Sequence, residues 1–342
     1  MGYYMFMLQI RTDIRKVITM NNTSSSADLN KKGFLFNIKR NAPYLLMVLP
    51  GVVLLSVFSY LPMMGVLIAF KNMKFFSNNI FINFVNSDWV GFDNFKFFFN
   101  TPDAFNITKH TILYNLVFII LGIIIPISCA IGLNELLNTK MSKLYQSSML
   151  LPYFLSWVVV SYLVYAFLNP DYGVVNNALR DILKMSGIDW YSNLKAWPFL
   201  FCFLNVWKYS GYGTVIYLSA ITGISHEYYE AAAIDGATKW QQIKNITIPS
   251  LRQIICVLTI LALGRVFTGD FGLFYQSSMN LGGGLLKPVG DVIDTYVYNS
   301  LLGLGDIGMA SAASLYQSVV GCVLIILSNL VVRKIDKESA LF

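Results

Sequence analysis

Residues 227–249 read EYYEAAAIDGATKWQQIKNITIP, a polar, charged and turn-bearing stretch that lies between long apolar runs. Its first eight residues are good helix formers, and the Asp-Gly pair that follows them is a turn signal. Thr238 with Gln241 three residues later fits a capping box that begins a second helix. Pro249 suits the first turn of a third helix, where its missing N–H costs nothing. The stretch therefore predicts a helix, a tight turn and a short amphipathic helix, followed by a return to apolar surroundings.

The composition around this stretch is that of a membrane protein. Of 342 residues, 56% are hydrophobic and only 13% are charged, and the mean hydropathy is +0.57. A soluble domain carries about a quarter charged residues. The four cysteines fall inside apolar runs and the two histidines, His110 and His226, are far apart. The sequence therefore predicts a multispanning protein with no disulfide framework and no metal site.

A helix needs about 20 mostly apolar residues to cross a bilayer. Six segments meet that requirement: 43–70, 110–137, 145–168, 196–223, 249–268 and 309–332. Internal prolines in the first three segments predict kinks that pack against neighbouring helices. The fold class predicted is an all-α polytopic membrane protein with six transmembrane helices.

The basic residues indicate the orientation of these helices. With the N-terminus on one side, that side carries fifteen Lys and Arg residues in or next to its connecting segments, against eight on the other side. Because cytoplasmic loops are enriched in Lys and Arg, both termini are predicted to be cytoplasmic. We expect a cytoplasmic N-terminal segment at 1–42, partly flexible around NNTSSSADLN, a six-helix domain at 43–335, and a C-terminal tail at 336–342.

The spacing within the opening stretch resembles a known motif. Glu230-Ala231-Ala232, three residues, Gly236, nine residues and Ile246-Thr247-Ile248-Pro249 resemble the EAA loop of ABC importer permeases, which have Leu where this chain has Ile248. The stretches 270–276 and 291–321 look like those of oligosaccharide permeases of the polysaccharide-importer type, in the maltose-permease-like superfamily. This resemblance covers roughly residues 40–335.

The resemblance implies a type I ABC importer transmembrane fold in which residues 225–249 form the coupling loop. In that family the loop inserts into a cleft on an ATP-hydrolysing subunit and carries its movement to the spanning helices. The residues that carry over or that fit such a contact are Glu230, Ala231, Ala232, Asp235, Gly236, Ala237, Trp240, Ile243 and Ile246.

The resemblance also implies the partners. These are a second homologous permease, expected to form a heterodimer with this chain, two ABC ATPase subunits that bind ATP and Mg, an extracytoplasmic solute-binding protein and an oligosaccharide. The chain has no phosphate-binding loop of the G-x-x-x-x-G-K-[ST] pattern and no defensible catalytic set. It is therefore expected to be a transport subunit rather than an enzyme, with no cofactor of its own and no nucleic-acid partner. It would lie among the lipids of a bacterial plasma membrane.

Polar and ionisable residues inside apolar segments are costly and point to a transport path. Sugars are held by hydrogen-bonding groups and by aromatic rings that cover the apolar face of the sugar. The candidates for the substrate path are Asn205, Lys208, Tyr209, Tyr212, Arg265, Thr268, Asp270, Tyr275 and Gln317, with Trp157 and Trp207 as further aromatic candidates. Lys208 and Arg265 hint at an acidic sugar, although Arg265 and Asp270 could instead pair with each other.

Three other functions remain open at this level. The EAA spacing does not separate an oligosaccharide importer from one for a peptide, an amino acid or an ion. An ion-coupled secondary transporter would predict inverted repeats, which the sequence does not display, and it leaves the EAA pattern unexplained. A membrane-embedded enzyme lacks a catalytic set.

Overall fold

The structure is a computed structural model that describes residues 41–74, 77–96, 102–136, 138–182, 184, 186–279, 284–303, 305–335 and 340. The chain divides into two compact units, Met1–Gly65 and Val66–Phe342. The predictions for the segment 1–42 and the tail 336–342 fall almost wholly outside the described residues.

The described part of the first unit is helical. Helix α3 spans Ala42–Leu55, a π-helical turn η1 spans Ser56–Tyr60, and α4 spans Leu61–Met63. The π turn ends two residues before Pro62, whose missing N–H removes one hydrogen bond of the regular helix. The internal proline is thus accommodated by a local change of helical pitch, and the apolar helix continues to Phe70 through the 3₁₀ turn η2, Met64–Phe70.

The described residues of the second unit form helices, except for one pair of two-residue strands that the sequence did not predict. Strand β1, Lys71–Asn72, pairs antiparallel with β2, Asp88–Trp89. The helical elements are α5 (Ile80–Asn86), η3 (Asp93–Phe95), α7 (Pro102–Asn134), α8 (Thr139–Phe154), α9 (Trp157–Leu168), α10 (Val174–Asp181), α11 (Trp197–Thr222), α12 (His226–Ile234), α13 (Lys239–Gln242), η4 (Ile243–Thr247), α14 (Ile248–Ser250), α15 (Arg252–Leu263), η5 (Gly272–Gln276), α17 (Lys287–Gly290), α18 (Ile293–Gly303) and α19 (Ile307–Ile335).

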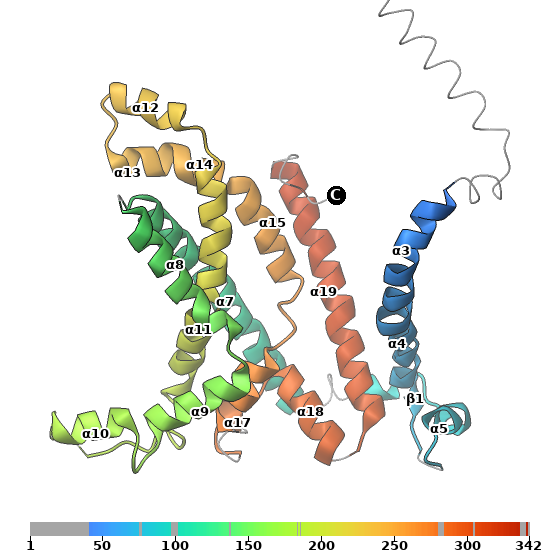
Figure 1. Cartoon of the computed structure of the whole chain (residues 1–342). Coiled ribbons are helices and arrows are strands. Elements are labelled where there is room, and N and C mark those ends of the chain that lie inside the picture. The colour runs from blue at the N-terminus through green and yellow to red at the C-terminus, as the bar shows by residue number, and fades with distance from the viewer. Residues whose placement is uncertain are drawn as a thin grey trace, which may run out of the picture. The chain divides into compact units, whose positions relative to one another are not determined.

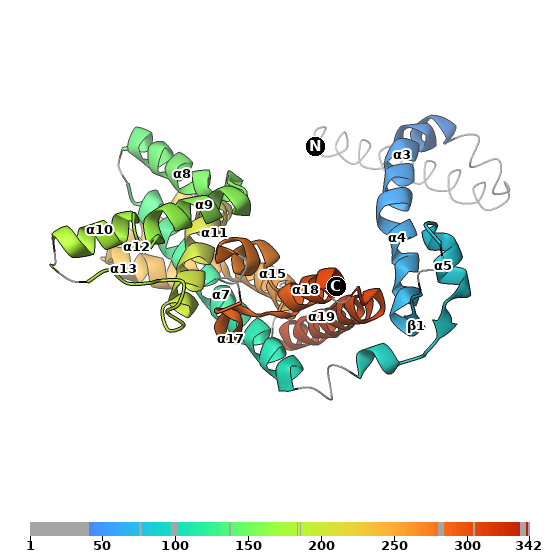
Figure 2. The same cartoon turned by 90° about the horizontal axis from the view of Figure 1, so that it is seen from below.

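Helix α11 is the centre of the second unit, and it packs most extensively against α7 and α8. Figure 1 shows α12 and α13 at one end of this unit and α10, α17 and α18 at the other. Figure 2, from below, shows α7 and α11 next to each other. Two apolar clusters lie along α11: one contains Phe201 and Phe274, whose ring centroids are 4.7 Å apart, and the other contains Tyr217 and Leu251.

The helices long and apolar enough to cross a membrane are fewer than six in the part of the chain that the structure describes. Three qualify alone, Ala42–Phe70, Ala104–Asn134 and Ile307–Lys334, and two bent helix pairs would bring the number to five. Helix α11 is 26 residues long but is not in this set. A mainly helical fold is therefore confirmed, whereas the count of six spans and the side of the termini stay predictions.

Two of the predicted segments are not continuous helices. Segment 145–168 is divided between α8 and α9, which meet at 101°. The break follows Pro152, and Ser156 caps α9 by accepting a hydrogen bond from the Val159 N–H. The prediction of a helix over 249–268 is wrong at its end, because α15 stops at Leu263.

The contact between α8 and α11 depends on Gly211. A Cβ atom at this position would lie 1.8 Å from the main-chain oxygen of Met149, so only glycine permits the two helices to approach this closely. Gly211→Ala is expected to destabilise the protein by about 1–3 kcal/mol through overpacking, measured as a lower thermal unfolding midpoint in detergent. Gly132→Ala is the matched control, since a Cβ atom there meets nothing within 4 Å. Equal midpoints for the two variants would contradict this packing argument.

Candidate functional site

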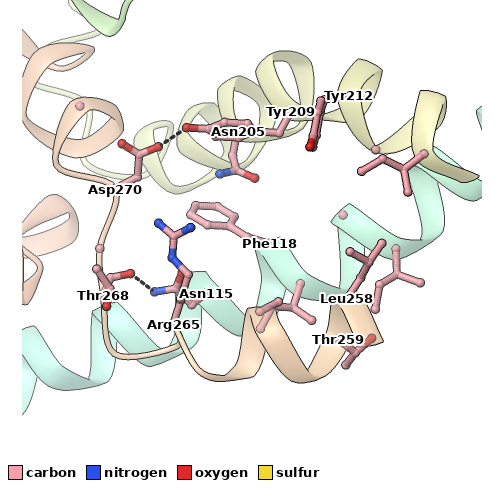
Figure 3. Close-up of a pocket in the computed structure, with 18 of the residues that line it drawn as sticks. Asn115, Phe118, Asn205, Tyr209, Tyr212, Leu258, Thr259, Arg265, Thr268 and Asp270 are labelled. Carbon is pink, nitrogen blue, oxygen red and sulfur yellow. Dashed lines mark hydrogen bonds between the residues drawn. The ribbon is translucent and has the colours of Figure 1, made fainter. Parts of the chain in front are cut away.

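A pocket of about 590 Å³ lies among α7, α11, α15 and the segment that follows α15 (Figure 3). We call it the central pocket. Its lining residues are Asn115, Phe118, Ile119, Gly122, Ile123, Asn205, Tyr209, Tyr212, Gly213, Ile216, Tyr217, Leu258, Thr259, Ala262, Arg265, Thr268, Gly269, Asp270, Phe271 and Gly272. The lining combines tyrosine and phenylalanine rings with amide, hydroxyl and charged groups, which is the combination that a polar ring compound with apolar faces requires.

The central pocket brings together two thirds of the predicted substrate-path residues, although they come from distant parts of the chain. These are Asn205, Tyr209 and Tyr212 on α11, with Arg265, Thr268 and Asp270 after α15. The last three owe their position to the early end of α15. Residues 264–270 are not helical. The directions of their side chains therefore do not follow the 3.6-residue repeat of the helix that the sequence predicted here.

The carboxylate of Asp270 is already hydrogen-bonded within the chain. Its Oδ2 accepts from Trp157 Nε1 at 3.1 Å and from the Tyr209 hydroxyl at 2.7 Å, and its Oδ1 accepts from the Leu273 main-chain N–H at 3.2 Å. These donors neutralise much of the cost of placing a carboxylate here. Asp270 therefore links α9, α11 and η5 at one end of the pocket.

Arg265 contributes a charged guanidinium to the lining of the pocket. It forms no hydrogen bond and no ion pair with any residue that the structure describes, and Figure 3 shows it directed into the pocket on the side of Asn205 and Asp270. The pairing of Arg265 with Asp270 that the sequence left open is thus absent among the described residues. Five N–H donors in a planar fork suit a carboxylate on a bound molecule.

Lys208 is separate from the central pocket. Its side chain is 5% exposed, and its ammonium group donates to the main-chain oxygens of Pro152, Tyr153 and Leu155. These are carbonyls at the end of α8, where the helix leaves its last C=O groups without partners. The ammonium therefore lies at the break between α8 and α9 and not in the lining of the central pocket, and a role of Lys208 on the substrate path stays a prediction.

Two more candidates lie outside the lining. Tyr275 stacks on Phe271 with ring centroids 4.8 Å apart. Gln317 is 9% exposed, and its Nε2 donates to the Phe267 oxygen at 2.7 Å and to Asp294 Oδ2 at 3.0 Å. Asp294 belongs to α18, outside the helices long enough to span, and burial raises the pKa of its carboxyl above the ordinary value. Of the two further aromatic candidates, Trp157 reaches the site through Asp270, and Trp207 packs against the apolar core.

Sequence reasoning missed the contribution of α7 to the pocket. Asn115 lines it and donates through Nδ2 to the main-chain oxygens of Val266 and Thr268, while Phe118 supplies an aromatic face. Asn115 is an amide inside a long apolar run, so the rule that selected Asn205 would have found it. Phe118 had no such signal among its apolar neighbours.

The predicted turn at 235–237 is a Schellman motif that joins α12 to α13. The Ala237 N–H donates to the Ala232 oxygen at 2.8 Å, and the Gly236 N–H donates to the Ala233 oxygen at 3.1 Å. Gly236 has a φ of +79°. Residues other than glycine adopt this left-handed conformation only at a cost in free energy. The capping box of Thr238 and Gln241 is confirmed.

We call residues 226–247 the hairpin, because α12 runs back along α13 and η4. The Tyr229 hydroxyl lies 2.9 Å from Thr247 Oγ1, and Lys239 forms an ion pair with Glu135 at the end of α7. Of the predicted coupling residues, Glu230, Ala231, Asp235, Gly236 and Trp240 are exposed, and Ala232, Ala237, Ile243 and Ile246 are half-buried. The large apolar side chains Trp240 and Ile234 are 71% and 87% exposed.

No metal centre accompanies these features in the described part of the chain. No group of three or more His, Cys, Asp or Glu side chains there could hold a metal ion, and the four cysteines are free thiols.

Residues 122–337 match the family model described as a binding-protein-dependent transport system inner membrane component. The chain belongs to this family. It is 33% identical over 307 residues to protein LplB of Bacillus subtilis. The aligned region covers 88% of this chain and 92% of LplB. It is 31% identical over 311 residues to the polygalacturonan/rhamnogalacturonan transport system permease protein YteP of the same organism, over 90% of this chain and 93% of that one.

The fold of this transport component is also similar to solved structures. A chain of a bacterial ABC transporter involved in the import of the acidic polysaccharide alginate is 30% identical, with a TM-score of 0.78, over 88% of this chain and 99% of that chain. The bacterial alginate ABC transporter in complex with an alginate pentasaccharide-bound periplasmic protein has a chain with the same identity and TM-score, over 90% and 99%. The chain is therefore an ABC permease in fold as well as in sequence.

The contacts of Lys208 generate a prediction for this permease. Lys208→Met removes the donor from the carbonyls that end α8, so the protein is expected to lose about 1–3 kcal/mol of stability without a change in which cargo it transports. A thermal unfolding midpoint in detergent measures the first effect. Lys195→Met, at an exposed lysine, serves as the control. An unchanged midpoint together with an altered cargo preference would return Lys208 to the transport path.

Proposed function

We propose that this chain is one permease subunit of an ATP-driven importer that carries an acidic oligosaccharide across a bacterial plasma membrane. The subunit pairs with a second, different permease and with two ATPase subunits that bind ATP and Mg. An extracytoplasmic binding protein delivers the sugar. The proposal rests on one arrangement above all: an exposed hairpin at one end of the helices, and between them a pocket with an arginine that has no partner among the described residues.

The hairpin is proposed to dock on an ATPase subunit. Burying an isoleucine or a larger apolar side chain stabilises a contact by about 1.5–3 kcal/mol, and buried tryptophan is a frequent centre of such interfaces. Trp240 and Ile234 are exposed in the isolated chain, so a partner surface would bury both. The Schellman turn makes the hairpin stiff enough to transmit movement, and the Lys239–Glu135 ion pair connects it to α7.

The charge of the pocket supports an acidic cargo. Lys208 donates to main-chain carbonyl groups, and the carboxylate of Asp270 accepts from donors within the chain. Among these three residues, only Arg265 has side-chain donors without a partner in the described part of the chain. The names of two relatives, which refer to polygalacturonan and to alginate, agree with a uronate-containing sugar. Tyr209, Tyr212 and Phe118 would cover the apolar faces of its rings.

The same proposal includes the topology. We infer six spanning helices with both termini in the cytoplasm, since the distribution of Lys and Arg puts the hairpin on the positive side. The central pocket would then be reached from outside when the importer is open in that direction.

The experiment that tests the function is purification of the tagged chain from its native membrane, with identification of the proteins that accompany it. A second permease and an ATPase are expected, with hydrolysis of ATP stimulated by a sugar-loaded binding protein. A chain that purifies alone and transports without ATP would overturn the proposal in favour of a secondary transporter.

Gly236→Val is expected to abolish co-purification of the ATPase, because a β-branched residue resists a φ of +79° and opens the hairpin. The expected cost is about 1–2 kcal/mol for the turn alone. Gly236→Asn is the matched control, since asparagine adopts the left-handed conformation more readily, and it should retain most of the ATPase. Equal retention by the two variants would count against the turn as the coupling element.

Arg265→Gln is expected to lower uptake of a uronate oligosaccharide about ten-fold or more, because a hydrogen bond to a charged group contributes about 1.5–3 kcal/mol. Uptake of a neutral oligosaccharide of equal length should change little. Proteoliposomes that contain the complete importer, supplied with binding protein loaded with each sugar, measure both rates. Thr259→Val, a change at the far end of the pocket lining, is the control; an unaltered ratio in Arg265→Gln would exclude the arginine as the carboxylate contact.

A further inference from the structure

The non-helical segment after α15 carries several main-chain polar groups that have no helical partner. Helix α15 stops at Leu263, residues 264–267 form turns, and residues 268–270 are extended or irregular before Phe271 begins the next helical element. In apolar surroundings each unsatisfied N–H or C=O group costs several kcal/mol. Such a break is stable only where neighbouring side chains satisfy the exposed main chain.

Three polar side chains from three helices do this for four consecutive residues. Asn115 of α7 donates to the oxygens of Val266 and Thr268, at 3.0 and 3.1 Å. Gln317 of α19 donates to the Phe267 oxygen at 2.7 Å. The Gly269 N–H donates to Asp294 Oδ2 of α18 at 2.5 Å. We call Asn115, Asp294 and Gln317 the clasp.

Two members of the clasp are hydrogen-bonded to each other outside the lining of the central pocket. Gln317 Nε2 donates to Asp294 Oδ2 at 3.0 Å, so α18 and α19 hold the segment together. Neither residue belongs to the lining of the central pocket. The fit is close, because a Cβ atom at Gly269 would lie 2.7 Å from Val292 Cγ2 and 3.0 Å from Asp294 Oδ2.

The segment held by the clasp carries polar groups that line the central pocket. Arg265 precedes the four clasped residues, Thr268 is one of them, and Asp270 follows them directly. Arg265 has no partner that holds its guanidinium among the described residues. Its location therefore depends on where the main chain is held, which is the role of the clasp.

We propose that Asp294 and Gln317 are positioning residues that determine cargo selectivity through Arg265 without touching the cargo. The inference rests on the proposed function, since it concerns the same pocket. A role in stability alone would reduce transport of every sugar in proportion to the amount of folded importer. A positioning role changes the ratio between sugars.

The test compares Asp294→Leu, Asp294→Asn and Gln317→Leu in the complete importer in proteoliposomes. Asp294→Leu removes the acceptor of the Gly269 N–H, whereas Asp294→Asn keeps one oxygen for it. Asp294→Leu is expected to change the ratio of uronate to neutral oligosaccharide uptake by at least about threefold, and Asp294→Asn by less. Leu302→Ala, on an exposed position of the same helix α18, should leave the ratio unchanged.

A double variant separates action through Arg265 from an independent effect. If Asp294 acts through the arginine, Arg265→Gln with Asp294→Leu should have the ratio of Arg265→Gln alone, because coupled residues are not additive. Additive changes in the ratio, or an unchanged ratio in Asp294→Leu, would overturn the proposal. If Asp294→Leu fails to assemble, Gln317→Leu carries the same comparison.

A second measurement keeps this inference distinct from the proposed cargo. In a chain whose four native cysteines are replaced by alanine or serine, Thr268→Cys reports the position of the segment through its rate of reaction with a maleimide. Adding Gln317→Leu or Asp294→Asn is expected to change that rate by about threefold or more, and adding Leu302→Ala is not. If Arg265→Gln does not alter selectivity but the thiol rate does change, the acidic-cargo proposal and the selectivity role through Arg265 both fail, while the role of Asp294 and Gln317 in holding the segment stands. An unchanged thiol rate would show that Asp294 and Gln317 do not hold the segment in position, and it would overturn the inference.

Discussion

Breaks in the helices leave main-chain N–H and C=O groups that an apolar environment does not satisfy, and the second unit is arranged around the side chains that satisfy them. Lys208 donates to carbonyls at the end of α8. Asn115, Asp294 and Gln317 satisfy the segment after α15. Each of these side chains comes from a helix distant in sequence from the break, so the breaks and the helix packing depend on one another.

This dependence explains why polar residues in this chain have different roles despite similar settings in the sequence. Lys208 and Arg265 are both cations within predicted spanning segments. The ammonium of Lys208 donates hydrogen bonds to main-chain oxygens, while the guanidinium of Arg265 faces the pocket. The carboxylate of Asp270 accepts from Trp157 and Tyr209, so it stabilises one end of the pocket and leaves the arginine without a counter-ion there. Of these three charged groups, only the guanidinium of Arg265 has no partner among the residues that the structure describes.

The hairpin follows a different rule, because local interactions specify it. The Schellman hydrogen bonds, the left-handed Gly236 and the capping box of Thr238 and Gln241 all involve residues within six positions of one another. A local motif keeps its shape largely independently of the rest of the fold. Its exposed apolar residues, Trp240 and Ile234, then remain available for a contact outside the chain.

The sequence by itself determined the helical class, the family resemblance, and the helix–turn–helix form of residues 226–247, since periodicity, glycine and capping chemistry act over a few residues. It also identified most polar residues of the central pocket, because a polar group in an apolar run is conspicuous. Only the tertiary structure decided where α15 ends, that Lys208 is used by α8, and that Asn115 and Phe118 complete the pocket. The reason is physical: whether a main-chain group within an apolar segment is free or satisfied depends on partners far away in sequence, as for the Thr268 oxygen and Asn115, which are 153 residues apart. The pattern of residues around a main-chain group does not predict such distant partners.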